Sequence, residues 1–286
     1  MNRYFESCAG SITGTDHKKP LLWRNNQDAF RVVEKENVLI AVVADGCGSG
    51  KFNEMGAHIG INLITGFLVR EFVYGMAYNF VGDPQSLAAS LEGVRIGASA
   101  HLAHLIRLVE PESRSQFVND HLLFTLQVLV ITDTTAFIAG IGDGVYAVNG
   151  EVKQVGPFEK NEPPYLAYGD LVKSSIAPES CKFVVHACIP ADELASACIG
   201  TDGAADFTKI ATMTLPGKSE VIGPLSNFWT QDAYFKNPQA LQRRLNLINN
   251  PSSRIDWERK CLDVEHGRLK DDTTLVVVRR RLQPKE

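Results

Sequence analysis

The chain has 286 residues, of which 44% are hydrophobic and 22% charged, as expected for a globular protein with a sizeable core. Its net charge of −4 gives no basic field, so nucleic acid is not an expected partner. No stretch approaches the roughly 20 consecutive apolar residues of a membrane helix. The N-terminal segment has no apolar core of a secretory signal, and the six cysteines form no CxxC pair. We therefore expect a cytoplasmic protein with reduced thiols and no membrane partner.

The first predicted element is a β-hairpin. The segments RVVE (31–34) and NVLIAVVAD (37–45) flank a polar turn. If the turn is centred between Lys35 and Glu36, residue 26 lies opposite residue 45. Asp28 is then two positions away on the same face, because side chains alternate along a strand. The hairpin therefore brings Asp28 and Asp45 close enough to share a metal ion or its water.

Two helices follow the hairpin. The apolar stretch from 54 to about 76 predicts a buried helix. The second helix has Asp83 as its cap and Pro84 at its first position. Apolar residues then recur at spacings of three or four: Leu87, Leu91, Val94, Ala98, Leu102, Leu105 and Val109. We expect these residues to face the core.

The rest of the chain is mainly strands. Strand patterns occupy 122–132, 134–143, 145–149, 151–155, 182–188, 194–202 and 273–282. Residues 207–261 read as loops and helix, with 237–250 the clearest helical piece, and the arginines at 279–281 read as a solvated tail. This order predicts an α+β layered sandwich of mainly antiparallel sheets. A doubly wound parallel sheet would need regular strand–helix alternation, which is absent.

Aspartates mark the ends of the apolar segments. They are Asp28, Asp45, Asp143, Asp202 and Asp271. A carboxylate at the end of a buried strand is costly to desolvate unless a cation or donor compensates it. Any one Asp–Gly pair can be a plain turn, but several carboxylates at one rim indicate a hard divalent metal, Mg²⁺ or Mn²⁺, rather than zinc.

Five motifs resemble, in order, those of metal-dependent protein phosphatases of the protein phosphatase 2C (PPM) class, and the bacterial branch most of all. They are NNQDAF (25–30), VVADGCGSG (42–50), IGDG (141–144), TDGAAD (201–206) and KDDTTLVVV (270–278). The resemblance implies one catalytic domain over 1–286, with an insertion or access region at about 208–260. It also implies a four-layer α-β-β-α sandwich with a two-metal centre at one edge of the sheets.

The resemblance also implies roles for the aspartates. Asp45 would bridge two Mn²⁺ or Mg²⁺ ions, and Asp202 and Asp271 would complete the shell of the first ion, with Asp272 as a neighbour or substitute. The Gly46 carbonyl would bind the second ion, and Asp28 would hold it directly or through water. Asp143 and Asp206 match positions that hold a third ion in some relatives. The implied substrate is a phosphoserine or phosphothreonine in a protein.

Two parts of the family pattern are replaced. The phosphate-gripping arginine is expected at the position of Trp23, and Arg24 follows it. Some relatives carry a proton-donating histidine where this chain has Cys47. His17 could be a substitute acid; alternatively it is an exposed histidine in a basic loop.

Two other functions remain as alternatives. The replaced residues are compatible with a catalytically inactive phosphatase-fold binding protein. The segment VVADGCGSGKF also resembles a phosphate-binding loop, but Asp45 stands where that loop needs glycine and Phe52 where it needs serine or threonine.

The aromatic residues Phe228, Trp229, Tyr234, Phe235 and Trp257 predict a small satellite core, with substrate access as the alternative.

Overall fold

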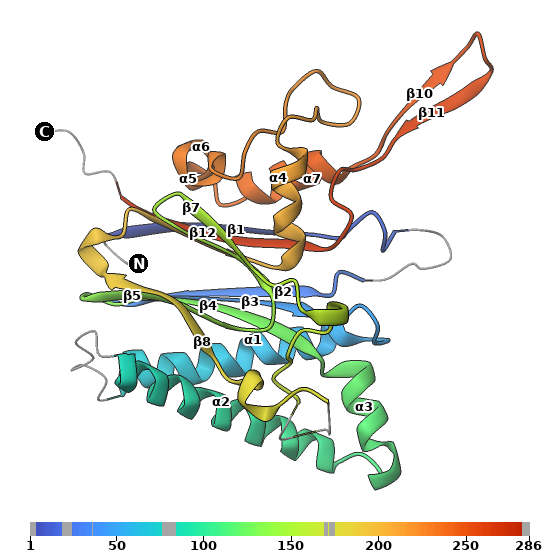
Figure 1. Cartoon of the computed structure of the whole chain (residues 1–286). Coiled ribbons are helices and arrows are strands. Elements are labelled where there is room, and N and C mark those ends of the chain that lie inside the picture. The colour runs from blue at the N-terminus through green and yellow to red at the C-terminus, as the bar shows by residue number, and fades with distance from the viewer. Residues whose placement is uncertain are drawn as a thin grey trace, which may run out of the picture.

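Two five-stranded antiparallel sheets form the centre of the computed structural model (Figure 1). The structure describes residues 4–18, 25–35, 37–75, 84–168, 171 and 175–281. The first sheet has the order β1 (Phe5–Ile12), β12 (Thr273–Arg280), β9 (Ser196–Gly200), β6 (Gly144–Val148) and β7 (Glu151–Val155). The second has the order β2 (Asp28–Glu34), β3 (Leu39–Gly46), β4 (Phe124–Ile131), β5 (Thr135–Ile141) and β8 (Val184–Pro190).

Helices cover the outer face of each sheet. The second sheet packs on α1 (Asn53–Val69), which continues into a π-helical turn at Arg70–Tyr74, and on α2 (Pro84–Arg107), with α3 (Arg114–His121) at their end (Figure 1). The first sheet is covered by α4 (Phe207–Ile210), α5 (Asn227–Thr230), α6 (Ala233–Lys236) and α7 (Ala240–Asn249). The predicted four-layer α-β-β-α sandwich is confirmed.

The central strands are buried on both faces. On β3, Leu39, Ala41 and Val43 lie in the core between the sheets, which also contains Val276 of β12. The alternate residues of β3, such as Ile40, lie in the core beneath α1 and α2. This two-sided burial explains why the central strands are continuous apolar runs rather than alternating patterns.

Three sequence predictions about these elements are wrong in detail. In the hairpin, Asp28 lies directly opposite Asp45, so the pairing is shifted by two residues from the predicted register. On α2, Leu105 is 36% exposed, and Ile106, four residues after the buried Leu102, takes the buried position near the helix end. Val109 lies beyond that end, and Asp83 lies outside the described residues.

Near the C-terminal end of the described chain, Arg279 is not a solvated side chain. Its Nε lies 2.7 Å from Glu6 Oε1 and its Nη2 2.9 Å from Asp232 Oδ1, and its guanidinium stacks on the ring of Phe235. Arg280 Nε donates to the Leu194 carbonyl at 3.0 Å. Strand β12 therefore extends through these arginines.

The region predicted as loops and helix contains a further strand pair. β10 (Ser252–Asp256) and β11 (Cys261–Glu265) form a two-stranded sheet that projects from the body (Figure 1). Phe228, Trp229 and Tyr234 lie in the main core under the first sheet rather than in a satellite core, and Trp257 is exposed. None of the helices in the described ranges is long and apolar enough to cross a membrane.

Candidate metal centre

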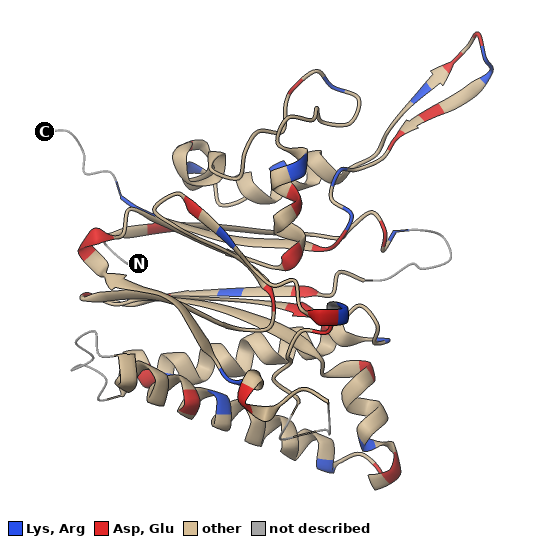
Figure 2. Ribbon diagram, viewed as in Figure 1, with Lys and Arg blue, Asp and Glu red and all other residues tan. Residues whose placement is uncertain are grey.

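The two sheets contribute acidic residues to the same end of the sandwich. Asp28 is the first residue of β2 and pairs with Asp45 near the end of β3. Asp202 follows β9, and Asp271 precedes β12. In Figure 2, Asp and Glu segments gather at this end of both sheets. The antiparallel pairing thus assembles carboxylates that are far apart in the sequence.

A cleft of about 240 Å³ opens between these strand ends. Four aspartates line it: Asp45, Asp143, Asp202 and Asp271. The remaining lining residues are His17, Gln27, Gly46, Cys47, Gly48, Ser49, Thr125, Pro163 and Tyr165. The structure therefore brings five of the predicted ligand positions and His17 to one cavity.

The carboxylates of the cleft repel one another. The pKa of Asp45 is raised well above its usual value, first by burial and then by the charges of Asp28 and Asp202. Burial, followed by repulsion from Asp202, raises the pKa of Asp143 and of Asp271 to about 6. Burial also raises the pKa of Asp202. Such a cluster is stable in its charged form only with a compensating cation.

Two buried carboxylate oxygens show where in the site a cation is needed. Within the described residues, Oδ1 of Asp28 and Oδ1 of Asp202 are buried and have no hydrogen-bond partner. A buried acceptor without a donor is expensive, and native proteins rarely leave one. The donor set is entirely oxygen, which suits Mg²⁺ or Mn²⁺. The residues therefore fit the predicted hard metal ions.

Asp28 lies beneath the cleft rather than in its wall. It is 3% exposed, and its Oδ2 accepts a hydrogen bond from Thr201 Oγ1 at 2.8 Å. Burial, and next the charge of Asp272, raises the pKa of Asp28 well above its usual value. Asp28 thus borders the site from below, with one oxygen held and one without a partner.

The loop after β3 is held in place by Asn53, the first residue of α1. Asn53 Nδ2 donates to the Cys47 carbonyl at 2.8 Å, and its Oδ1 accepts from the Leu123 amide at 3.2 Å. A Cβ on Gly46 would lie 2.8 Å from the Asn53 carbonyl oxygen and 2.9 Å from that of Gln27. Only glycine fits this crowded position, so the backbone at Gly46 can approach the aspartates closely.

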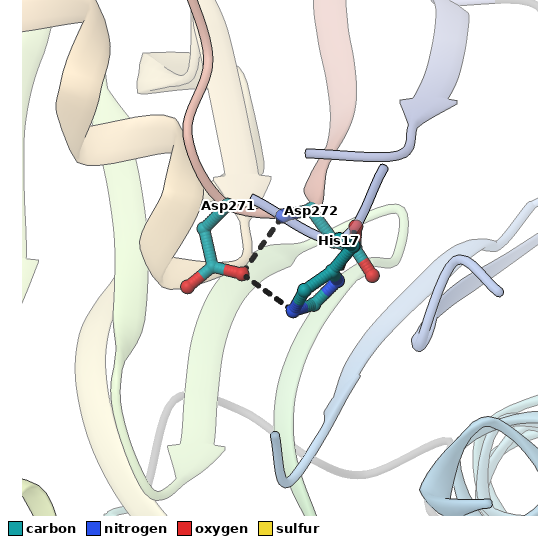
Figure 3. Close-up of side chains that lie close together, drawn as sticks. All are labelled: His17, Asp271 and Asp272. Atoms are coloured by element: carbon teal, nitrogen blue, oxygen red, sulfur yellow. Dashed lines mark hydrogen bonds and ion pairs between the residues drawn. The ribbon is translucent and has the colours of Figure 1, made fainter. Parts of the chain in front are cut away.

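Asp271 and Asp272 have different surroundings (Figure 3). Asp272 is buried and accepts hydrogen bonds from the amides of Gly14 at 2.7 Å and Gln27 at 2.6 Å. His17 lies beside both carboxylates, with Nδ1 2.9 Å from Asp272 and Nε2 3.8 Å from Asp271. The Asp272 carboxylate therefore anchors the loop that carries His17, whereas Asp271 lines the cleft.

The tightest grouping of possible ligands differs from the predicted one. Within the described part of the chain, one group of three residues has ligand atoms all within 4.8 Å of one another: His17, Asp271 and Asp272 (Figure 3). Because both Asp272 oxygens already accept backbone hydrogen bonds, we attribute this grouping to loop anchoring. The other cleft aspartates surround a wider space.

Three further sequence predictions concern residues that are not among those lining this cleft in the described part of the chain. Asp206 lines a neighbouring cleft, where Lys209 Nζ lies 2.9 Å from its Oδ1. Arg24 lies outside the described residues. Lys51, which a phosphate-binding loop would need at the ligand, lies 3.1 Å from Asp120 and is not among the cleft residues.

Sequence reasoning missed several supporting residues. Thr201 binds Asp28, and Gln127 Nε2 donates to the Asp143 carbonyl at 3.1 Å. Tyr165 lines the cleft, and its pKa is raised by burial and by its neighbour Cys47. Thr201 stands directly before Asp202 and could have been found from that position. Gln127 lies within an apolar run and carries no signal of its own.

Comparisons with known proteins agree with the fold. The sequence model of the family described as protein phosphatase 2C matches residues 15–245. A bacterial serine phosphatase has a similar structure with a TM-score of 0.53, at 13% sequence identity, over 99% of this chain and 100% of that one. Serine/threonine phosphatase Stp1 from Staphylococcus aureus has a TM-score of 0.51 at 12% identity, over 99% of this chain and 97% of that one.

At such low sequence identity, the similarity to these structures shows a shared fold alone. No curated protein matches the sequence. The family match is different in kind, because it covers most of the chain and includes the segments that carry Asp28, Asp45, Asp143 and Asp202. The chain therefore belongs to the protein phosphatase 2C family.

Proposed function

We propose that this protein is a protein serine/threonine phosphatase that depends on two Mn²⁺ or Mg²⁺ ions. The observation that carries the proposal is the pairing of Asp28 with Asp45 beside a cleft lined by three further aspartates. The unpartnered oxygens of Asp28 and Asp202 support it. Membership of the phosphatase family supports the reaction class. Because each sheet supplies part of the site, we also propose that the chain acts as one catalytic domain.

The cleft residues would divide the ions between them. Asp45 pairs with Asp28 and lines the cleft together with the other aspartates, so it would contact both ions. Asp202 and Asp271 would complete the shell of one ion, and the Gly46 carbonyl would bind the other. Asp28 would reach that second ion through water, since it lies beneath the cleft wall. Asp143 is a candidate for a third ion, with Asp206 at the edge of the neighbouring cleft.

When bound, such ions supply a water of lowered pKa and stabilise the charge of an in-line displacement at phosphorus. The chain itself would position the phosphate and protonate the leaving oxygen. His17 is the candidate for the proton, because its ring lies in the cleft beside Asp271. Arg24 is proposed to grip the phosphate on its sequence position alone.

The test is hydrolysis of p-nitrophenyl phosphate and of a phosphothreonine peptide with Mn²⁺. Asp45→Asn should lower kcat/KM about 100-fold or more, since metal ligands and their supports contribute at least this much. The matched control is Asp133→Asn, an exposed aspartate in the turn between β4 and β5. Calorimetric titration with Mn²⁺ should show tight binding to the wild type and to the control variant.

Two results would contradict the proposal. A wild-type protein that binds Mn²⁺ but turns over neither substrate would be a phosphatase-fold binding protein. A protein that neither binds Mn²⁺ or Mg²⁺ nor hydrolyses phosphate esters would overturn the metal centre as well.

A further inference from the structure

The strand pair β10–β11 forms an arm (residues 252–265) with two unlike faces. Residues directly opposite in an antiparallel pair share a face, and faces alternate along each strand. Ile255 pairs with Leu262, and Ser253 with Val264, so these four residues share one face. That face is exposed: Ile255 by 50%, Leu262 by 59% and Val264 by 42%. Trp257, at the start of the turn, is 80% exposed.

The opposite face is polar, and its base contacts the body. Arg254 pairs with Asp263 on it. At the base of the arm, Glu265 Oε2 accepts hydrogen bonds from the Gly217 amide at 3.2 Å and from Arg268 at 3.0 Å. The polar face is therefore tied to the body at its base, whereas Ile255, Leu262 and Val264 leave much of their apolar surface exposed.

The tip of the arm has a defined turn. Asp256 Oδ1 accepts hydrogen bonds from the amides of Glu258 and Arg259, each at 2.9 Å. This aspartate turn holds the two strands in register. An apolar face on a preformed hairpin loses little conformational freedom when it binds, which favours its use as a binding surface.

A large cleft lies beside both the base of the arm and the metal centre. Its volume is about 820 Å³. Pro251, His266 and Arg268 line it at the base of the arm, and at the other end Asp16, Lys18 and Lys270 line it next to His17 and Asp271. Its side walls include Asp206 and Lys209, with Ile210 and Met213. Residues that directly flank the metal centre and residues that directly flank the arm thus line one and the same cleft.

Cations outnumber carboxylates in the lining of this cleft, and two of the cations are in ion pairs: Lys209 with Asp206 at 2.9 Å and Arg268 with Glu265 at 3.0 Å. Lys18, Lys209, Arg268 and Lys270 line it together with two acidic residues, Asp16 and Asp206. The chain as a whole has a net charge of −4, yet these four cations lie in a cleft beside its acidic metal centre. Such a lining favours a ligand with acidic residues.

We propose that the cleft and the arm form a docking site for the phosphoprotein substrate. Acidic residues next to the phosphorylated residue would lie in the cleft, and an apolar part of the same protein would lie on the exposed face of the arm. The proposal rests on the proposed phosphatase function and adds to it the class of substrate. The arm lies outside the residues 15–245 that the family model matches.

The substrate protein fits the surface better than a second copy of the chain does. A second copy could cover the apolar face of the arm, but it would leave the cation-rich cleft without a complementary partner. An acidic phosphopolypeptide complements both surfaces, because a single ligand bound at the metal centre can extend along the neighbouring cleft towards the base of the arm.

The test compares two substrates on the full chain with Mn²⁺: phosphorylated β-casein, whose phosphoserines lie among acidic residues, and p-nitrophenyl phosphate, which is too small to reach the arm. The measured quantity is the ratio of kcat/KM for casein to kcat/KM for the small ester. In the triple variant Ile255→Ser, Trp257→Ser, Leu262→Ser, the ratio should fall at least about ten-fold. The matched control changes the polar face, Arg254→Ser with Asp263→Ser, and should keep the wild-type ratio.

A second variant guards against local misfolding of the arm. Ser253 and Val264 are directly paired, so an Asn–Gly turn can replace residues 254–263 and close a shorter hairpin. This variant should lower the ratio as much as the triple variant does. An unchanged ratio in both variants, or an equal fall in the polar-face control, would overturn the docking site. So would a wild-type protein that is dimeric by light scattering and becomes monomeric in the triple variant, because the arm would then bind a second copy. Absence of p-nitrophenyl phosphate hydrolysis in the wild type would instead overturn the phosphatase function.

Discussion

Asp271 and Asp272 are adjacent in the chain but have opposite exposures. The side chain of Asp271 is 56% exposed and lines the aspartate cleft, whereas that of Asp272 is 2% exposed and binds the backbone of two loops. One residue is available to a ligand, and its neighbour is already satisfied by the protein. The same substitution at the two positions should therefore have different effects.

We expect Asp272→Asn to destabilise the fold and Asp271→Asn to abolish activity. Asp272 accepts two charge-assisted hydrogen bonds in a buried place, so its loss should cost about 2–4 kcal/mol of unfolding free energy. Asp271→Asn should leave the stability in EDTA unchanged or higher, because it removes a repelled charge. Urea denaturation in EDTA measures the stabilities, and p-nitrophenyl phosphate with Mn²⁺ measures activity. Equal losses of stability in the two variants would contradict these separate roles.

Metal binding should weaken as the pH falls through about 6. Asp143 and Asp271 have pKa values raised from 3.8 to about 6, so protons compete with the metal in this range. If one proton is displaced per ion, the affinity falls about ten-fold per pH unit below that value. Calorimetric titration of Mn²⁺ at pH 5, 6 and 7.5 tests this. An affinity that is the same at pH 5 and 7.5 would show that these carboxylates do not hold the ions.

The same carboxylates determine whether the stability of the metal-free protein rises or falls with pH. A pKa raised on folding gives a stabilising contribution that is complete below pH 3.8 and is lost as the pH rises through 6. The cluster therefore favours the fold less at pH 7.5 than at pH 5 in EDTA, whereas bound Mn²⁺ offsets the repulsion. The difference in Tm between the Mn²⁺-loaded and EDTA-treated protein should widen from pH 5 to 7.5. A difference that narrows over this range would contradict the assignment.

If His17 donates the proton, the loss of kcat caused by its substitution should depend on the leaving group. The serine alkoxide of a phosphopeptide needs protonation as it leaves, whereas p-nitrophenolate does not. His17→Gln should therefore lower kcat for a phosphoserine peptide about 100-fold and kcat for p-nitrophenyl phosphate only a few-fold. Because His17 also contacts Asp272, a purely structural role is the competing explanation. That role predicts the same loss with both substrates.

Thr201 should contribute to stability through two hydrogen bonds. Its hydroxyl donates to Asp28 at 2.8 Å and accepts from the Thr274 amide at 3.0 Å. Thr201→Val keeps the shape but leaves both partners unsatisfied, so we expect a loss of about 2–4 kcal/mol. Urea denaturation measures it, with Thr208→Val on exposed α4 as the control. A loss no larger than that of the control would mean that water replaces the hydroxyl.

The hairpin shows what a strand pattern can and cannot predict. The pattern correctly places Asp28 and Asp45 on one face, but the predicted register differs from the observed one by two residues. A shift of two returns every side chain to the same face, so the apolar pattern cannot distinguish the two pairings. The turn decides between them, and its residues carried no strong signal.

Other parts of the structure depend on contacts between distant residues. Arg279 is buried because β1 places Glu6 beside it, 273 positions away in the sequence. The strands of the arm were missed because polar residues interrupt them and no core selects an apolar pattern there. The α+β layered sandwich of mainly antiparallel sheets, in contrast, was predicted from the order of strands and helices, and the four-layer arrangement from the resemblance to the phosphatase family.

The pairing of β1 with β12 has a consequence for biosynthesis. The first and last strands of the described chain lie side by side over eight residue pairs, from Phe5↔Arg280 to Ile12↔Thr273. Asp271 reaches the cleft only when β12 has taken its place between β1 and β9. A nascent chain that still lacks its last strand therefore has an open sheet and an incomplete ligand set, however well its N-terminal hairpin has formed. Pairing of β1 with β12 as the chain folds thus completes the ligand set of the proposed metal centre.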